Sequence, residues 1–160
     1  MSVARSYVVS GLPLEPFRPL FGLSDEALAE QQIVRMMVDA PIGFPCRVTL
    51  EDAQPGETVL LLNYEHQPAE TPYRSRHAIF VNEHATQTRR AVGEIPGALA
   101  VRKALSLRAF DAAGMMVDAE IASGDALEPV IERMFEAPEV AYIHAHNAGR
   151  GCYAARIDRA

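Results

Sequence analysis

Cysteine is scarce in this chain, which has only two such residues among 160, Cys46 and Cys152. The two lie far apart, and neither belongs to a Cys-x-x-Cys pair. A disulfide framework and a zinc ribbon both require several cysteines at characteristic spacings. The sequence therefore excludes these two classes and predicts two reduced thiols.

Long hydrophobic runs are missing as well. The longest apolar stretches, such as 59–62 and 140–143, have four members, whereas a membrane-spanning helix needs about 20 residues. The first residues, MSVARSYVVSGLPLEPF, are interrupted by glycine and proline and lack the continuous apolar core of a secretory signal. We therefore expect no membrane partner and a cytoplasmic location.

Lysine is nearly absent, because Lys103 is the single lysine among 15 basic residues. The other basic residues are arginines, and together with a high alanine content they indicate a GC-rich coding bias. Arginine suits planar oxyanions, but this bias lowers the value of each arginine as a functional signal. The 21 acidic residues give a net charge of −6, which disfavours a nucleic-acid partner because the phosphate backbone is repelled.

The composition is otherwise that of an ordinary globular protein, with 49% hydrophobic and 22% charged residues. A chain of this length is suited to one shared hydrophobic core. We therefore expect a single globular domain over residues 1–160. The sequence contains no internal repeat and no glycine-rich phosphate-binding loop at the start of a helix.

Strand-like patterns outnumber helical ones and are joined by short turns. Strands are expected over 5–10, 33–38, 46–50, 58–64, 77–82, 104–110, 115–121, 140–146 and 152–158. The stretch 59–62 is apolar on both faces, which indicates a central strand. Adjacent strands with few helices predict an α+β fold, in which a largely antiparallel sheet has one or two covering helices.

Two helices are expected to cover this sheet. A short helix over 25–31 follows Ser24, a good N-cap residue. A longer, amphipathic helix over 126–136 has one apolar face, and we expect Asp125 and Glu128 to cap its first turn. The apolar residues of that face are Leu127, Val130, Ile131 and Met134.

Reactive side chains concentrate in two segments. The first, residues 64–77, is a long and densely functional connection between two strands, and it contains His66 and His77. The second is the pair His144 and His146, which the two-residue period of a strand places on one face. Imidazole exchanges protons and binds transition metals near neutral pH. We predict that the two segments approach within about 10 Å, the scale of an ordinary ligand pocket.

The register of the last hairpin decides which side chain lies beside these histidines. A five-residue connection over 147–151 pairs His146 with Cys152 and puts the thiol beside the imidazoles. A four-residue connection instead pairs Asn147 with Cys152 and turns the thiol away, because a slip of one residue reverses every side chain. We favour the five-residue connection, because it gives the last strand one coherent apolar face. That face consists of Tyr153, Ala155 and Ile157.

Four phrases, taken together and in this order, resemble one bacterial family. They are GFPCRVTLEDAQPGE, LLLNYEHQPAETPYRSRHAIFV, ALSLRAFDAAG and VAYIHAHNAGRGCYAARI. The chain is similar, over roughly residues 17–159, to the family catalogued as domain of unknown function 1203. The resemblance implies a stand-alone bacterial domain. It implies no catalytic role, because the family has no assigned reaction.

The histidines and the polar residues of these phrases form the candidate site. The candidate catalytic residues are His66, His77, His144 and His146. The candidate ligand-binding residues are Arg47, Tyr64, Tyr73, Arg74, Arg108 and Asn147. Our leading hypothesis is an enzyme or binder of a small polar or anionic ligand. In such a site histidine exchanges a proton, arginine neutralises negative charge and tyrosine donates a hydrogen bond.

Two alternatives stay open. One is a non-catalytic protein-interaction domain with structural histidines, and a concave surface shared by the two segments would argue against it. The other is a histidine-based metal-binding protein. Additional ligands would then come from His66, His77, His84 or Cys152, but none of these has a metal-type short spacing to His144. The sequence therefore assigns no metal ligand set, no cofactor, no reaction and no oligomeric state.

Overall fold

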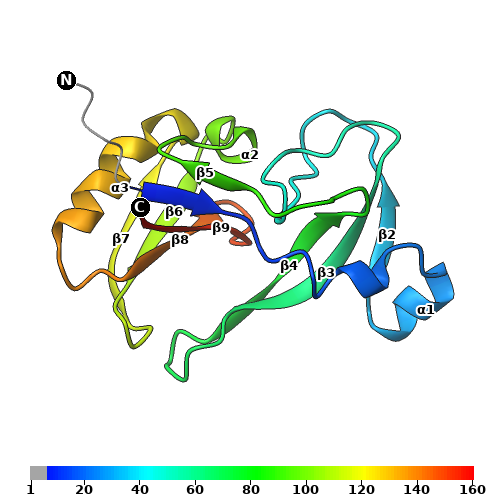
Figure 1. Cartoon of the computed structure of the whole chain (residues 1–160), viewed down its shortest axis with the longest axis horizontal. Helices are drawn as coiled ribbons and strands as arrows, with labels where there is room; N and C mark the ends of the chain where they lie inside the picture. The colour runs from blue at the N-terminus through cyan, green and yellow to red at the C-terminus, as the bar shows by residue number, and fades with distance from the viewer. Residues whose placement is uncertain (1–6) are drawn as a thin grey trace.

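The structure, a computed structural model, describes residues 7–160, and over these the chain folds into two sheets (Figure 1). The larger sheet has the order β5 (Arg90–Val92), β1 (Tyr7–Ser10), β9 (Tyr153–Arg159), β8 (Tyr142–Asn147), β6 (Leu105–Phe110), β7 (Met116–Ala122). The smaller sheet has the order β2 (Val34–Met37), β3 (Thr58–Gln67), β4 (Ser75–Asn82). Every strand pairing within these sheets is antiparallel, which confirms the expected α+β fold and the central position of the strand around 59–62.

Helices are few and short in the described part of the chain. They are α1 (Asp25–Glu30), α2 (Gly97–Ala100) and α3 (Leu127–Glu136), with 3₁₀ turns η1 (Arg18–Leu20) and η2 (Gly124–Ala126). Within residues 7–160, no helix has the length and apolarity needed to cross a membrane. The sequence patterns do not predict β5 or α2, because segments of three and four residues are too short to show a period.

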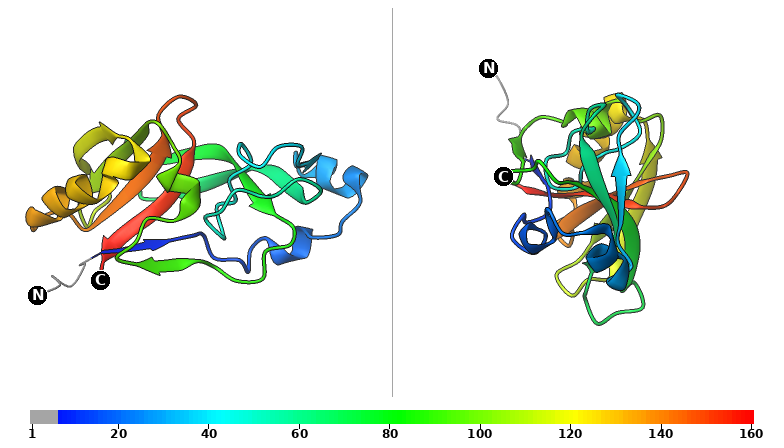
Figure 2. Two further views of the ribbon diagram at one scale, coloured as in Figure 1. Left: turned by 90° about the horizontal axis from the view of Figure 1, so that it is seen from above. Right: turned by 90° about the vertical axis from the view of Figure 1, so that its right-hand side faces the viewer.

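Helix α3 covers one face of the six-stranded sheet (Figure 2). Leu127, Ile131 and Met134 are buried in the same cluster as Leu107 and Ile143 of the sheet, which confirms the predicted apolar face. Each such side chain contributes about 1.5–3 kcal/mol through removal of its surface from water.

The predicted cap of α3 is wrong. The N-cap residue is Ala126, and no side chain accepts a hydrogen bond there. Asp125 instead lies in the preceding turn η2 and accepts a hydrogen bond from Ser123. The chain forms the 3₁₀ turn η2 before the helix begins, so Asp125 belongs to this turn and lies one residue before the N-cap.

The expected strand over 46–50 is also wrong, because these residues form a turn in which Leu50 N donates to Cys46 O at 3.0 Å. Its alternating apolar residues serve two different cores. Leu50 packs in the cluster under α3, whereas Cys46 and Val48 pack in a second cluster against β3 and β4. The alternating burial over 46–50 therefore results from a turn that packs against both cores, and it does not indicate a strand.

Glu83 connects two strands of the smaller sheet to the loop before α1. Its carboxylate accepts from Arg35 Nε at 2.7 Å, from Thr58 Oγ1 at 2.9 Å and from Gly22 N at 3.1 Å. The hydrogen bond from Arg35 is the main cause that lowers the pKa of Glu83 to about 2. The carboxylate is therefore charged throughout the neutral range and holds the loop before α1 against β2 and β3.

We expect Glu83→Gln to lower the free energy of unfolding by about 1–3 kcal/mol, because Arg35 keeps its exposed partner Asp25 but loses its charge-assisted hydrogen bonds to the mostly buried carboxylate of Glu83. Urea denaturation monitored by circular dichroism measures this loss. The matched control is Glu94→Gln, which removes an exposed ion pair with Arg89 and is expected to cost about 0.5 kcal/mol or less. Equal losses in the two variants would contradict this stabilising role of Glu83.

Candidate functional site

Four histidines from three strands meet between the two sheets. His66 lies on β3, His77 on β4, and His144 and His146 on β8. The ring centroid of His66 is 5.0 Å from that of His146 and 5.9 Å from that of His144. The predicted approach of the two segments is confirmed. These four residues are called the histidine cluster below.

The two-residue period of β8 explains why its histidines face the smaller sheet. Ile143 and Ala145 pack in the cluster under α3, so the side chains between them point to the opposite face. His144 and His146 are both buried there. Tyr153 of β9 joins them, and its ring stacks on His66 with centroids 4.9 Å apart.

The hydrogen bonds of the cluster are incomplete. His66 Nε2 and His77 Nδ1 are 2.6 Å apart, so one ring donates to the other. His146 Nδ1 is 2.9 Å from the carbonyl oxygen of Gly151 and donates to it. His66 Nδ1 and His144 Nδ1 are buried and have no hydrogen-bond partner among the residues of the described part. A buried polar atom without a partner is costly and requires an explanation.

Burial keeps the cluster uncharged. It lowers the pKa of His66 to about 4 and the pKa values of His144 and His146 to about 3. The pKa of His77 is lowered too, again by burial first and by the charge of Arg108 second. At neutral pH these imidazoles are therefore neutral, and each has one nitrogen lone pair.

The predicted register of the last hairpin is wrong. His146 lies opposite Tyr153, and a bulge then places His144 opposite Arg156. At the turn, Asn147 N donates to Cys152 O at 2.9 Å, so the connection is the four-residue alternative. Gly151 closes it with φ of 80°, a conformation that glycine adopts without steric cost.

The observed register of the hairpin changes where the thiol of Cys152 and the ring of Tyr153 lie. The bulge directs Tyr153 into the histidine cluster, so the expected apolar face of Tyr153, Ala155 and Ile157 does not form. The thiol of Cys152 instead accepts from Asn147 Nδ2 at 3.1 Å and from Arg47 Nη2 at 3.3 Å. A thiol–imidazole pair is thereby excluded for this structure.

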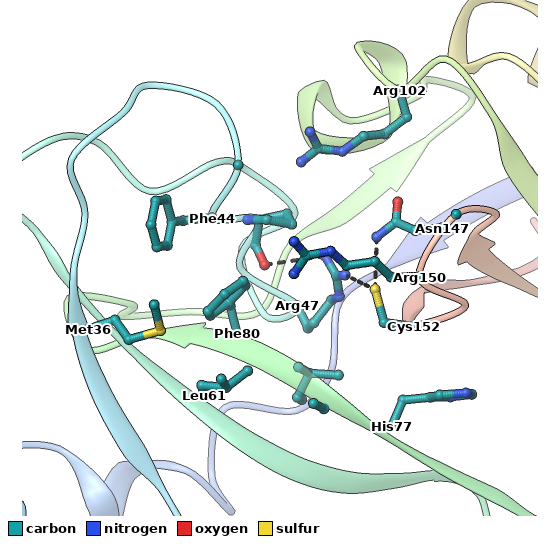
Figure 3. A pocket seen from close by; sticks show the side chains of 15 residues that line it. Met36, Phe44, Arg47, Leu61, His77, Phe80, Arg102, Asn147, Arg150 and Cys152 are labelled. Carbon is teal, nitrogen blue, oxygen red and sulfur yellow. Dashed lines mark hydrogen bonds between the residues drawn. The ribbon is translucent and has the colours of Figure 1, made fainter.

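A pocket of about 710 Å³ lies beside the histidine cluster (Figure 3). One end is apolar and the other is polar. The apolar side chains that Figure 3 labels are Met36, Phe44, Leu61 and Phe80. The labelled polar side chains are Arg47, His77, Arg102, Asn147, Arg150 and Cys152. His77 therefore belongs to both the histidine cluster and the pocket.

Arg47 is the most deeply buried charged group of the pocket, with 3% of its surface exposed. Its guanidinium donates to the carbonyl oxygen of Pro45 at 3.2 Å and to the thiol of Cys152, while Nε has no partner among the described residues. Burial is the main cause that lowers the pKa of Arg47, and the charge of Arg102 adds to it. Arg102 itself is neutralised by Asp52 at 2.8 Å.

Four of the six predicted ligand-binding residues, Tyr64, Tyr73, Arg74 and Arg108, do not line the pocket. Tyr64 packs against Phe17 with ring centroids 5.6 Å apart, and Tyr73 lies exposed near the end of the β3–β4 hairpin. Arg74 forms an exposed ion pair with Glu65. β3 and β4 extend into both ends of the expected loop, so Tyr64 is a strand residue whose side chain lies on one face of the sheet, whereas Tyr73 and Arg74 belong to the irregular segment 68–74.

Arg108 and Asn147 lie near the cluster, but only Asn147 also lines the pocket. Arg108 is opposite His144 in the β6–β8 pairing, and burial lowers its pKa. Sequence reasoning missed Arg102 and Arg150, because a chain whose basic residues are nearly all arginine offers no local signal that singles them out.

The fold and the site together define an α+β protein of two antiparallel sheets, with a buried histidine cluster beside an arginine-lined pocket. Residues 43–159 match the family described as Protein of unknown function (DUF1203), and the chain belongs to that family. The match includes all four histidines of the cluster and every lining residue of the pocket except Met36. No curated protein and no solved structure matches the chain significantly.

Proposed function

We propose that this protein binds a small amphipathic anion in the pocket, with Arg47 as the anchor of the negative group. The observation that supports this most directly is the burial of that guanidinium without a carboxylate partner in the described part of the chain. A buried charge is costly unless it is paired, and an anionic ligand supplies the missing partner.

The rest of the lining fits such a ligand. The pocket lining contains three arginines and no acidic residue, in a protein of net charge −6. Asp52 neutralises Arg102, so Arg47 and Arg150 supply the positive potential that attracts anions. The apolar end, with Phe44 and Phe80, accommodates a hydrocarbon portion, and the volume is in the range of ordinary small-molecule sites.

The histidine cluster gives this pocket a group that exchanges protons. His77 lines the pocket and is hydrogen-bonded to His66, whereas His144 and His146 lie behind them. We therefore place acid–base chemistry, where the ligand undergoes it, at His77, with His66 as its hydrogen-bonding partner. The concave site formed by both segments supports a ligand-binding function over a protein-interaction domain.

Paired ligands test the charge requirement. Phenylacetate, hexanoate and phenyl phosphate are each compared with a neutral analogue, such as phenylacetamide, by thermal shift and calorimetry. We expect at least one acid to bind and its neutral analogue to bind about tenfold more weakly, since one charge-assisted hydrogen bond contributes about 1.5–3 kcal/mol. Equal binding of every acid and its analogue would contradict the proposal.

Arg150 offers a variant that is safe for folding, because it is exposed and has no ion pair with the residues that the structure describes. We expect Arg150→Ala to weaken binding of the acid about tenfold, and Arg47→Met to abolish it. Arg18→Ala, an exposed arginine paired with Glu15 outside the pocket, is the control and should bind as the parent does. Unchanged affinity in Arg150→Ala would remove this residue from the site.

A further inference from the structure

We infer that His66, His144 and His146 form a binding site for one divalent transition-metal ion. One ring nitrogen of each residue lies within 4.8 Å of a ring nitrogen of the other two, and all three residues are buried. The cluster joins β3 of one sheet to β8 of the other, so the site exists only in the folded chain. The inference is independent of the anion pocket and concerns different atoms.

Each of the three neutral rings keeps one nitrogen lone pair, and hydrogen bonds determine its place on His146 and His66. His146 donates from Nδ1 to the carbonyl oxygen of Gly151, which leaves Nε2 free to coordinate. With the proton of His66 on Nε2, donated to His77, the lone pair of His66 is on Nδ1. Metal-binding histidines characteristically donate their second nitrogen to a carbonyl or another acceptor, which fixes the ring and its tautomer.

The two buried nitrogens without a partner are the strongest evidence. His66 Nδ1 and His144 Nδ1 find no hydrogen-bond donor or acceptor among residues 7–160. In a cluster of histidines that only stabilised the core, each buried nitrogen would be expected to have a partner. A metal ion satisfies both atoms at once, because neutral imidazole nitrogen is a strong ligand for transition metals.

The donor set selects the kind of ion. It contains three imidazoles, and Cys152 is directed instead toward Arg47 and Asn147. Imidazole ligands favour Zn²⁺, Co²⁺, Ni²⁺ and Cu²⁺, whereas Mg²⁺ and Ca²⁺ require oxygen ligands. Three protein ligands leave a fourth position of a tetrahedral ion open to water or another small ligand.

A bound ion has two consequences for the site, one geometric and one electrostatic. Nitrogens bound at about 2.0–2.1 Å in tetrahedral geometry are roughly 3.4 Å apart, so binding draws these rings together and stiffens the contact between the sheets. Arg108 lies opposite His144 and Arg156 lies opposite it on the other side. Arg156 is paired with Asp158, and the charge of Arg108 opposes the cation itself but favours an anionic group, such as hydroxide, at the open position.

The test uses the untagged full-length chain, stripped of metal with a chelator and titrated with Zn²⁺ by calorimetry and with Co²⁺ by visible absorption. We expect one equivalent per chain, a rise in melting temperature, and absorption bands of four-coordinate Co²⁺ that Zn²⁺ abolishes. Folded metal-free protein that shows no saturable binding at one equivalent would overturn the proposal. No pocket ligand is present, so this outcome is separate from the outcome of the anion experiment.

Variants locate the ion. His144→Ala and His146→Ala are expected to abolish stoichiometric binding, and His77→Phe, which removes the hydrogen-bonding partner of His66, to weaken it roughly 10–100-fold. The control is His84→Ala, which removes the exposed histidine outside the cluster and should leave binding unchanged. Binding lost in His84→Ala and kept in His144→Ala would overturn the assignment.

A measurement on the unsubstituted protein covers the case in which a ligand variant does not fold. Imidazole ¹⁵N resonances of the labelled chain are recorded with and without Zn²⁺. We expect the nitrogens Nδ1 of His66, Nδ1 of His144 and Nε2 of His146 to shift on binding, while those of His84 stay in place. Shifts confined to His84, or no shift in the cluster, would exclude this site.

Discussion

Metal-free protein is expected to lose stability steeply as the pH falls from 7 to 5. The histidines of the cluster have pKa values lowered to about 4 for His66 and about 3 for His144 and His146, mainly by burial. In the unfolded chain the same groups titrate near 6.5. Between these values the unfolded state binds more protons than the folded state, so acid favours unfolding.

The size of the effect follows from the same pKa difference. Each of the three histidines contributes stability that is fully present above about pH 6.5 and is lost at about 1.4 kcal/mol per pH unit below it. From pH 7 to pH 5 the loss is about 2 kcal/mol per histidine and on the order of 6 kcal/mol in total. This is comparable with the whole stability of a typical domain, so we expect acid unfolding near pH 5.

Urea denaturation at pH 7, 6 and 5, with a chelator present, measures this dependence. We expect His144→Phe to reduce the slope against pH by about a third, because one titrating group is removed. His84→Gln is the matched control, since this histidine is exposed, and its slope should equal that of the parent. Stability that stays constant between pH 7 and pH 5 would contradict the burial of neutral histidines.

Replacement of Gly11 by alanine is expected to destabilise the protein by about 3 kcal/mol or more. A β-carbon at this position would lie 2.0 Å from the carbonyl oxygen of Val48 and 3.1 Å from that of Arg47. Both are backbone atoms of the turn over 46–50, and Leu12 N donates to Arg47 O at 2.8 Å in the same contact. Gly11 and the turn over 46–50 therefore have to move apart, and this turn positions Arg47 in the pocket.

Two measurements on Gly11→Ala check this prediction. The free energy of unfolding is expected to fall, and affinity for the acid that binds the parent should fall with it, because the Arg47 turn is displaced. Gly97→Ala is the matched control, because a β-carbon there meets no atom within 4 Å, and we expect a change within about 0.5 kcal/mol. A Gly11→Ala variant as stable as Gly97→Ala would show that this contact is not tightly packed.

The elements that the sequence predicts well are those whose signals are local. Ser24 caps α1 as expected, and its hydroxyl accepts from Ala27 N at 3.1 Å. The apolar face of α3 and the β6–β7 hairpin also agree with the predicted residues, give or take a few at each end. In each case a repeat of 3.6 or 2 residues, or a cap residue, lies within one element and needs no knowledge of the partner.

The candidate site was predicted only in part from such local signals. The period of two in β8 alone placed His144 and His146 on one face, and the density of polar residues drew attention to His66 and His77. The same density also suggested Tyr64, Tyr73 and Arg74, which lie outside the pocket. Tyr64 lies on a strand, where neighbours alternate between faces, and Tyr73 and Arg74 lie in the irregular end of the hairpin, so closeness in sequence does not place side chains in one site.

By itself, then, the sequence determined the α+β class, the two main helices and the pairing of imidazoles on β8, because local periodicity encodes which face of an element is buried. Only the tertiary structure decided the bulge that directs Tyr153 to the histidines, the turn that places Arg47 in the pocket, and the contribution of Arg102. Each of these depends on backbone contacts between distant segments. Such contacts are selected by packing of the whole core, and no short stretch of sequence contains them.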